Sequence, residues 1–173
     1  MSKFLCLLAT KKGLEVLISA IDAGYSDSIG CVMTFCEKVS IDYQGEIIEV
    51  CNKHKIPHFH YNQNEGPSLI YSVIEEMQIS SIVAIGWRFL LPLELNEKLT
   101  IPIIVFHDSL LPKYRGFAPT PTAMMCGETT VGVTALFASE KVDQGDIIWQ
   151  KEIHVPIFNF ACVFAAHFGK AFR

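Results

Sequence analysis

The sequence lacks any run of apolar residues long enough to cross a membrane. A spanning helix needs about 20 consecutive apolar residues, and the most hydrophobic window, residues 82–95, is interrupted by Arg88 and Pro92. The apolar run at residues 4–9 is too short for a secretory signal peptide, and two lysines follow it. We therefore expect a cytoplasmic protein without a membrane partner.

Paired cysteines, an excess of basic charge and phosphate-binding glycine motifs are also missing. The formal net charge is −4, with 14 basic and 18 acidic residues. This balance argues against a nucleic-acid partner, because phosphate neutralisation requires a clustered basic surface. Neither G-x-G-x-x-G nor a P-loop occurs, so nicotinamide dehydrogenases and nucleoside triphosphatases are disfavoured. No C-x-x-C pair occurs, and we interpret the six cysteines as reduced thiols packed in the core.

The apolar residues that are present alternate between strand-like and helix-like patterns along a chain of 173 residues, a length typical of one domain, which we assign to residues 1–173. This alternation predicts an α/β fold, a Rossmann-like open and mostly parallel sheet with helices on both faces. Ligands of such sheets bind beyond the carboxyl ends of the strands, where the pattern places Gly86, His107 and Ala138. The predicted strands are 3–9, 29–35, 57–60, 81–85, 101–107, 131–138 and 146–154, and the predicted helices are 13–23, 45–54, 68–78 and 120–126.

Two motifs carry the clearest indication of chemistry. Residues 107–116 read HDSLLPKYRG, and residues 143–148 read DQGDII. Together they resemble the H-x-S-L-L-P-x-Y-R-G and D-x-G-x-I-I motifs of the folate-dependent formyltransferase family, which includes phosphoribosylglycinamide, methionyl-tRNA and sugar-nucleotide N-formyltransferases. The resemblance covers about residues 82–155. It implies the formyltransferase fold and transfer of a formyl group from 10-formyltetrahydrofolate to a small amine, without a metal.

The resemblance implies that His107 and Asp143 are catalytic. During formyl transfer the amine loses a proton and the leaving nitrogen gains one, so a proton shuttle is needed. Imidazole titrates closest to neutrality among the side chains, and a neighbouring carboxylate orients it and stabilises its charged form. The strand-end position of His107 fits this role.

The resemblance also implies two binding regions. Folate would bind against Gly86, Trp87, Arg88, Phe89, Leu90 and Leu91, with Ser139 and Val142 on the other side. The amine substrate would contact Ser109, Lys113, Tyr114, Arg115 and Gly116. For the first region the alternative is core packing of Phe89, Leu90 and Leu91, and for the second it is a solvated turn.

Arginine suits phosphate and tyrosine stacks on a base, so we expect a phosphate-bearing acceptor. A nucleotide-linked amino sugar of the kind used in O-antigen biosynthesis is preferred. Phosphoribosylglycinamide and methionyl-tRNA are the alternatives, and the acidic charge balance disfavours the tRNA.

Two features depart from the family pattern. Val105 stands where the family has an asparagine that donates to the developing oxyanion, and the loss of one such donor costs about 10² to 10³ in rate in hydrolases. An impaired remnant that binds folate or a nucleotide is therefore the non-enzyme alternative. The apolar stretch 158–172 predicts the start of a covering helix, and so a domain truncated at its end and a tendency to form a homodimer. A zinc site at Cys51, His54, His58 and His60 is disfavoured, because these residues straddle a predicted helix and strand.

Overall fold

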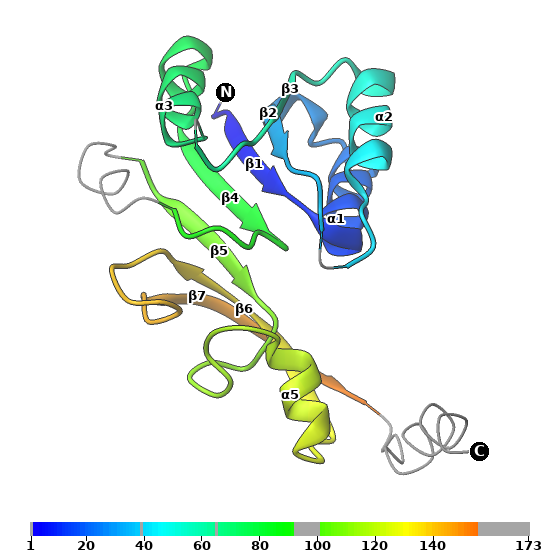
Figure 1. Cartoon of the computed structure of the whole chain (residues 1–173), viewed down its shortest axis with the longest axis vertical. Coiled ribbons are helices and arrows are strands. Elements are labelled where there is room, and N and C mark those ends of the chain that lie inside the picture. Colours follow the sequence, from blue (N-terminus) through cyan, green and yellow to red (C-terminus); the bar gives the residue numbers. More distant parts are fainter. Residues whose placement is uncertain (1, 39, 65, 92–100, 156–173) are drawn as a thin grey trace.

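The computed structural model describes residues 2–38, 40–64, 66–91 and 101–155, which form a seven-stranded sheet in the order β3-β2-β1-β4-β5-β6-β7 (Figure 1). Strands β1 to β5 pair in parallel, whereas β6 and β7 join antiparallel. The strands are β1 (Phe4–Leu8), β2 (Ile29–Thr34), β3 (His58–His60), β4 (Ser81–Ile85), β5 (Ile103–His107), β6 (Thr130–Phe137) and β7 (Ile147–His154). The helices are α1 (Thr10–Asp22), α2 (Gln44–His54), α3 (Gly66–Met77) and α5 (Pro119–Met125), with a 3-10 turn at Ser26–Ser28.

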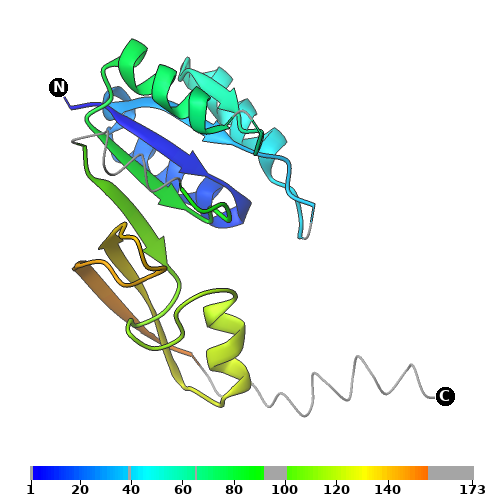
Figure 2. The ribbon, with the colours of Figure 1, turned by 60° about the vertical axis from the view of Figure 1, so that its left-hand side comes forward.

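Helices cover both faces of the parallel half of the sheet (Figure 2). Helix α3 packs on one face through Ile70, against Leu5 and Leu7 of β1. Helices α1 and α2 pack on the other face, where Leu17 meets Leu8. Successive side chains of a strand point to opposite faces, so a strand buried on both sides needs apolar residues at successive positions. This explains the continuous apolar run of β1.

Strand β6 runs antiparallel to β5. Its carboxyl end therefore lies at the amino end of β5, where the amide of Ala138 donates to the carbonyl oxygen of Ile103 at 2.8 Å. The sequence placed Ala138 at the same sheet edge as Gly86 and His107, and this edge was wrong because apolar periodicity does not reveal strand direction. Ala138 nevertheless lines the same cavity as Gly86 and His107, together with residues 139–143.

The predicted fold class is confirmed, and each predicted strand and helix appears with bounds shifted by at most 3 residues. The interpretation of every cysteine as a core residue was wrong for two of them. Cys31 and Cys51 are buried, but Cys36 and Cys126 are exposed. Cys162 lies outside the described residues.

The described part of the chain contains no helix that is both long enough and apolar enough to span a membrane. The stretch 158–172, from which a truncated end and a homodimer were predicted, lies outside the described residues.

Candidate active site

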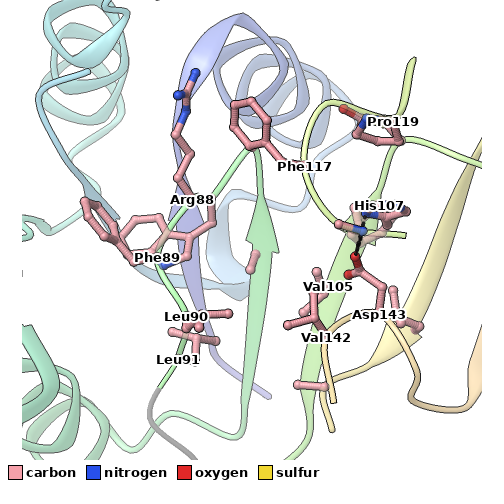
Figure 3. Close-up of a pocket in the computed structure, with 18 of the residues that line it drawn as sticks. Arg88, Phe89, Leu90, Leu91, Val105, His107, Phe117, Pro119, Val142 and Asp143 are labelled. Atoms are coloured by element: carbon pink, nitrogen blue, oxygen red, sulfur yellow. Dashed lines mark hydrogen bonds and ion pairs between the residues drawn. The ribbon is translucent and has the colours of Figure 1, made fainter. Parts of the chain in front are cut away.

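A cavity of about 770 Å³ lies at the carboxyl ends of β4 and β5. This volume is within the range of about 300 to 1,000 Å³ that small-molecule sites occupy. One wall is formed by the segment after β4, and the facing wall by the end of β5 and the loop after β6 (Figure 3). Of the residues that the sequence assigned to the site, the lining contains residues 86–91, His107, Gly116, Ser139, Val142 and Asp143.

His107 is nearly buried at the end of β5, and each of its ring nitrogens faces an oxygen acceptor. Nδ1 lies 3.4 Å from Oδ2 of Asp143, and Nε2 lies 2.8 Å from the carbonyl oxygen of Tyr114. A carbonyl oxygen only accepts, so Nε2 is the donor in its contact with Tyr114. The ring is thereby oriented with Nδ1 toward the carboxylate of Asp143.

Asp143 is brought to His107 by bonds from the loop that follows β5. Its Oδ2 accepts a hydrogen bond from the amide of Gly116 at 2.8 Å, and its carbonyl oxygen accepts one from Nε of Arg115 at 3.0 Å. The backbone of Asp143 is left-handed, with φ of 53°, a conformation that aspartate tolerates better than most residues. Arg115 and Gly116 thus hold the carboxylate in place from 27 to 28 residues away in sequence.

The wall after β4 joins an aromatic cluster to the cavity. Trp87 and Phe89 pack against Phe35 and Tyr61, with ring centroids 4.7 to 5.2 Å apart. Core packing therefore occupies one side of these two residues, while both still line the cavity. Gly86 begins the wall with φ of 65°, and a Cβ there would collide with the carbonyl oxygen of Ala9, so the close approach of β1 and β4 requires glycine.

The Arg88 side chain contacts two other segments of the chain, one with Glu37 and Ser40 and one with Phe117. Its Nε lies 2.7 Å from Oε2 of the buried Glu37, and one terminal nitrogen donates to Oγ of Ser40 at 3.3 Å. The guanidinium carbon lies 5.8 Å from the ring centroid of Phe117, within cation–π range. The sequence assigned Arg88 to folate binding but gave no indication that Glu37 orients it.

The residues predicted to contact the amine substrate divide into two groups. Gly116 lines the cavity, whereas Ser109, Lys113, Tyr114 and Arg115 are not in its lining. The hydroxyl of Ser109 is buried and donates to the carbonyl oxygen of Lys113 at 2.6 Å. These side chains therefore stabilise the loop that carries Gly116.

Glu128 contacts two further side chains of this loop, those of Lys113 and Tyr114. Lys113 Nζ lies 3.3 Å and the Tyr114 hydroxyl 2.9 Å from Oε1 of Glu128. This hydrogen bond raises the pKa of Tyr114 to about 12, because the neutral hydroxyl is the donor. The same bond lowers the pKa of Glu128.

Two residues that the sequence did not single out anchor the same loop from the antiparallel strands. The buried Thr134 donates to the carbonyl oxygen of Ser109 at 2.6 Å and accepts from the amide of Leu111 at 3.2 Å. Gln150 donates to the carbonyl oxygen of Leu111 and to the Thr134 hydroxyl, both at 2.9 Å. Because these bonds join positions 16 to 39 residues apart, local sequence patterns do not reveal them.

Three further residues shape the cavity beside His107. Val105 lines it from the same strand and offers no hydrogen-bond donor. Lys12, from the first turn of α1, forms an ion pair with Asp108, the residue after His107. Both members of this ion pair line the cavity.

No group of three or more histidine, cysteine or acidic side chains that could hold a metal ion occurs within the described residues. Cys51, His54, His58 and His60 are therefore not brought together as a metal site.

Comparison with known proteins agrees with this geometry. Residues 7–159 match the formyl transferase family. The chain belongs to this family. The match includes both of the motifs that carry His107 and Asp143 and extends to the parallel strands before them.

Relatives in the family include methionyl-tRNA formyltransferases. That of Thermosipho africanus is 40% identical over 112 residues, which are 64% of this chain and 35% of the relative. That of Ligilactobacillus salivarius is 36% identical over 107 residues, 62% of this chain and 33% of the relative. The chain thus spans about a third of the length of these relatives.

Solved structures share the fold. A phosphoribosylglycinamide formyltransferase from Anaplasma phagocytophilum superimposes with a TM-score of 0.77 at 22% identity, covering 99% of this chain and 81% of the other. A formyltetrahydrofolate deformylase from Pseudomonas syringae gives a TM-score of 0.74 at 21% identity, covering 94% and 56%. At this level of identity the likeness establishes the fold.

Proposed function

We propose that this chain transfers a formyl group from 10-formyltetrahydrofolate to a primary amine. The observation that carries the proposal is the ion pair of His107 and Asp143, 3.4 Å apart, in the wall of a cavity of about 770 Å³. Membership of the formyl transferase family supports the same chemistry.

The cavity fits a folate in size and in lining. A pterin is flat and amphipathic, and such ligands favour an apolar slot with a few fixed polar groups. Leu90, Phe117 and Val142 line the cavity yet are 77%, 80% and 51% exposed. We infer that a ring system between residues 86–91 and Ser139–Val142 covers these apolar side chains, and that their burial contributes to binding.

The chemistry assigned to the chain is proton transfer. The co-substrate supplies an acyl carbon that the amine can attack. The His107 imidazolium gives its proton to the leaving nitrogen and then accepts the proton that the amine loses. Asp143 stabilises the ring whenever it is charged, because its carboxylate is held against Nδ1 by the amide of Gly116.

For the acceptor, the relatives weigh against the nucleotide-linked amino sugar that the sequence motifs favoured. The names of the relatives specify methionyl-tRNA and phosphoribosylglycinamide. We place these two amines ahead of the amino sugar, and we infer that the acceptor amine enters beside Gly116, between His107 and the first turn of α1.

The experiment is an assay of the purified chain with 10-formyltetrahydrofolate and one acceptor at a time. The panel contains phosphoribosylglycinamide, methionyl-tRNA and an amino-deoxy sugar nucleotide. Release of tetrahydrofolate is followed by absorbance, and the formylated amine is identified by mass spectrometry. Omission of the acceptor separates transfer from hydrolysis to formate.

Formylation of one acceptor, lost in His107→Ala, supports the proposal. Folate binding without turnover of any acceptor indicates the impaired remnant and contradicts transferase activity. Failure to bind 10-formyltetrahydrofolate would contradict both the proposed function and the alternative of a folate-binding remnant.

A further inference from the structure

An acyl transfer needs a donor for the oxygen of the formyl group. When the amine attacks, this oxygen becomes an oxyanion, and donors positioned for it lower the barrier. Val105 and His107 lie on the same side of β5, because strand side chains alternate, and both line the cavity. Val105 cannot donate a hydrogen bond, so a donor to the oxyanion has to come from another element.

Several polar groups of the lining are already engaged. Arg88 is held by Glu37 and Ser40. The hydroxyl of Ser139 donates to the carbonyl oxygen of Lys141 at 2.8 Å. Glu37 and Ser40 thus direct the guanidinium of Arg88 toward themselves, and the single hydroxyl hydrogen of Ser139 is already used.

Lys12 is placed differently. Its ammonium is tied to the carboxylate of Asp108, and Asp108 follows His107 directly in the chain. An ammonium has three hydrogens, and the ion pair uses one, so two remain for a second acceptor. Its side chain is 51% exposed and lines the cavity, so a bound substrate can reach it.

We propose that Lys12 is a further catalytic residue, which donates a hydrogen bond to the oxyanion of the formyl group. The inference rests on the proposed function. The amine lone pair forms the new C–N bond while the carbonyl π electrons move to oxygen, where Lys12 meets the charge. Those electrons then re-form the C=O bond as the bond to N10 of the folate breaks. N10 takes the proton of His107, and His107 regains one from the amine.

Asp108 is the positioning residue in this arrangement. Without a partner, a lysine side chain samples many rotamers. The ion pair holds the ammonium beside Asp108, at the end of β5 and in the lining of the cavity.

The test compares Lys12→Met with Lys11→Met. Lys11 is the preceding residue, is exposed and does not appear in the lining of the cavity. We expect Lys12→Met to lower kcat by about 10² to 10³, as the loss of one oxyanion donor does, with KM for the acceptor unchanged. Lys11→Met should match the wild type. Binding of 10-formyltetrahydrofolate, measured by tryptophan fluorescence, should be the same in all three proteins, because the oxyanion is absent from the ground state.

A double variant separates direct donation from neutralisation of Asp108. If Lys12 served only to neutralise Asp108, Lys12→Met combined with Asp108→Asn would recover the activity. We expect the double variant to stay as impaired as Lys12→Met, and Lys12→Arg to recover part of kcat because it retains a donor.

The inference is overturned by full activity of Lys12→Met, by recovery in the double variant, or by a change confined to KM, which would indicate acceptor binding. If the wild type turns over no acceptor, both the proposed function and this inference fall. A wild type that is active alongside an unimpaired Lys12→Met overturns only the inference.

Discussion

His107 and Asp143 contact each other at the wall of the cavity, and we propose that they act as one unit. We predict that His107→Ala and Asp143→Asn each lower kcat by about 10² to 10⁴. The double variant should be little worse than the single ones, because residues that act together are not additive. Steady-state kinetics with the active acceptor measure this.

His54→Ala is the control for that experiment, because His54 is an exposed histidine at the end of α2. It should leave kcat unchanged. Full activity in His107→Ala would show that the ion pair has no part in proton transfer.

The cysteines offer a second residue-level prediction. Burial raises the pKa of Cys6 and Cys31 to about 12 and that of Cys51 to about 11, so these thiols stay neutral and inert. In the native protein we expect alkylation at Cys36 and Cys126, mapped by peptide mass spectrometry. The partly buried Cys6 and the buried Cys31 and Cys51 should react only after denaturation.

Within that pattern, Cys36 should react more slowly than an unperturbed thiol at pH 8. Its hydrogen bond to Asp42 raises its pKa, since the neutral thiol is the donor. Asp42→Asn should accelerate labelling of Cys36 while Cys126 serves as the internal reference. Rapid labelling of Cys51 in the folded protein would contradict the burial of α2 against the sheet.

How far the site could be predicted depends on where its contacts come from. His107, Asp143 and the wall at residues 86–91 were found because they belong to short motifs at strand ends. The anchoring roles of Thr134 and Gln150 were missed, because their partners lie far away in sequence. Lys12 was considered only as a surface lysine that could meet an anion, and its ion pair with Asp108 was not foreseen. The side-chain direction of Ser109 was likewise invisible, since a motif does not say which face a hydroxyl takes.

At the scale of elements, Thr134 couples β6 to the loop after β5. Thr134→Val leaves the Leu111 amide and the Ser109 carbonyl oxygen without their partner. An unsatisfied buried polar group costs about 1 to 3 kcal/mol. We predict that this variant lowers the free energy of unfolding by about that amount, measured by urea denaturation, and also lowers kcat, because the loop carries Gly116.

Thr130→Val is the matched control on the same strand. The Thr130 hydroxyl contacts the exposed His154, 3.1 Å away, and exposed substitutions usually change stability by less than about 0.5 kcal/mol. Equal effects of the two variants would mean that the buried network contributes nothing specific.

Elements were easier to predict than their arrangement. The strand positions follow from short continuous apolar runs and the helix positions from a period of about 3.6 residues, both of which the sequence displays directly. The direction of β6 is not evident from the sequence, because a strand that pairs antiparallel and one that pairs in parallel can have the same apolar pattern. Ala138 was therefore assigned to the wrong end of the sheet.

At the scale of the molecule, protection should fall across the sheet from the parallel half to β7. Strand β1 lies between β2 and β4 with helices on both faces, whereas all eight residues of β7 are exposed. We predict that amides of β1 and β4 exchange through global unfolding and that amides of β7 exchange by local opening, at least roughly tenfold faster. Hydrogen exchange with mass spectrometry tests this, and uniform protection across the sheet would contradict it.

Because β6 runs antiparallel to β5, the segment from Ala138 to Asp143 needs a minimum length. Ala138 is bonded to Ile103, whereas Asp143 contacts His107. Ile103 and His107 are four residues apart on β5, a distance of about 13 Å at roughly 3.3 Å per residue. The five steps from Ala138 to Asp143 span at most about 17 Å when fully extended. Four steps would span at most about 14 Å, which leaves almost no slack over the distance required. The two proposed catalytic groups are thus far apart in sequence, but the length of the short segment from Ala138 to Asp143 determines whether they can meet.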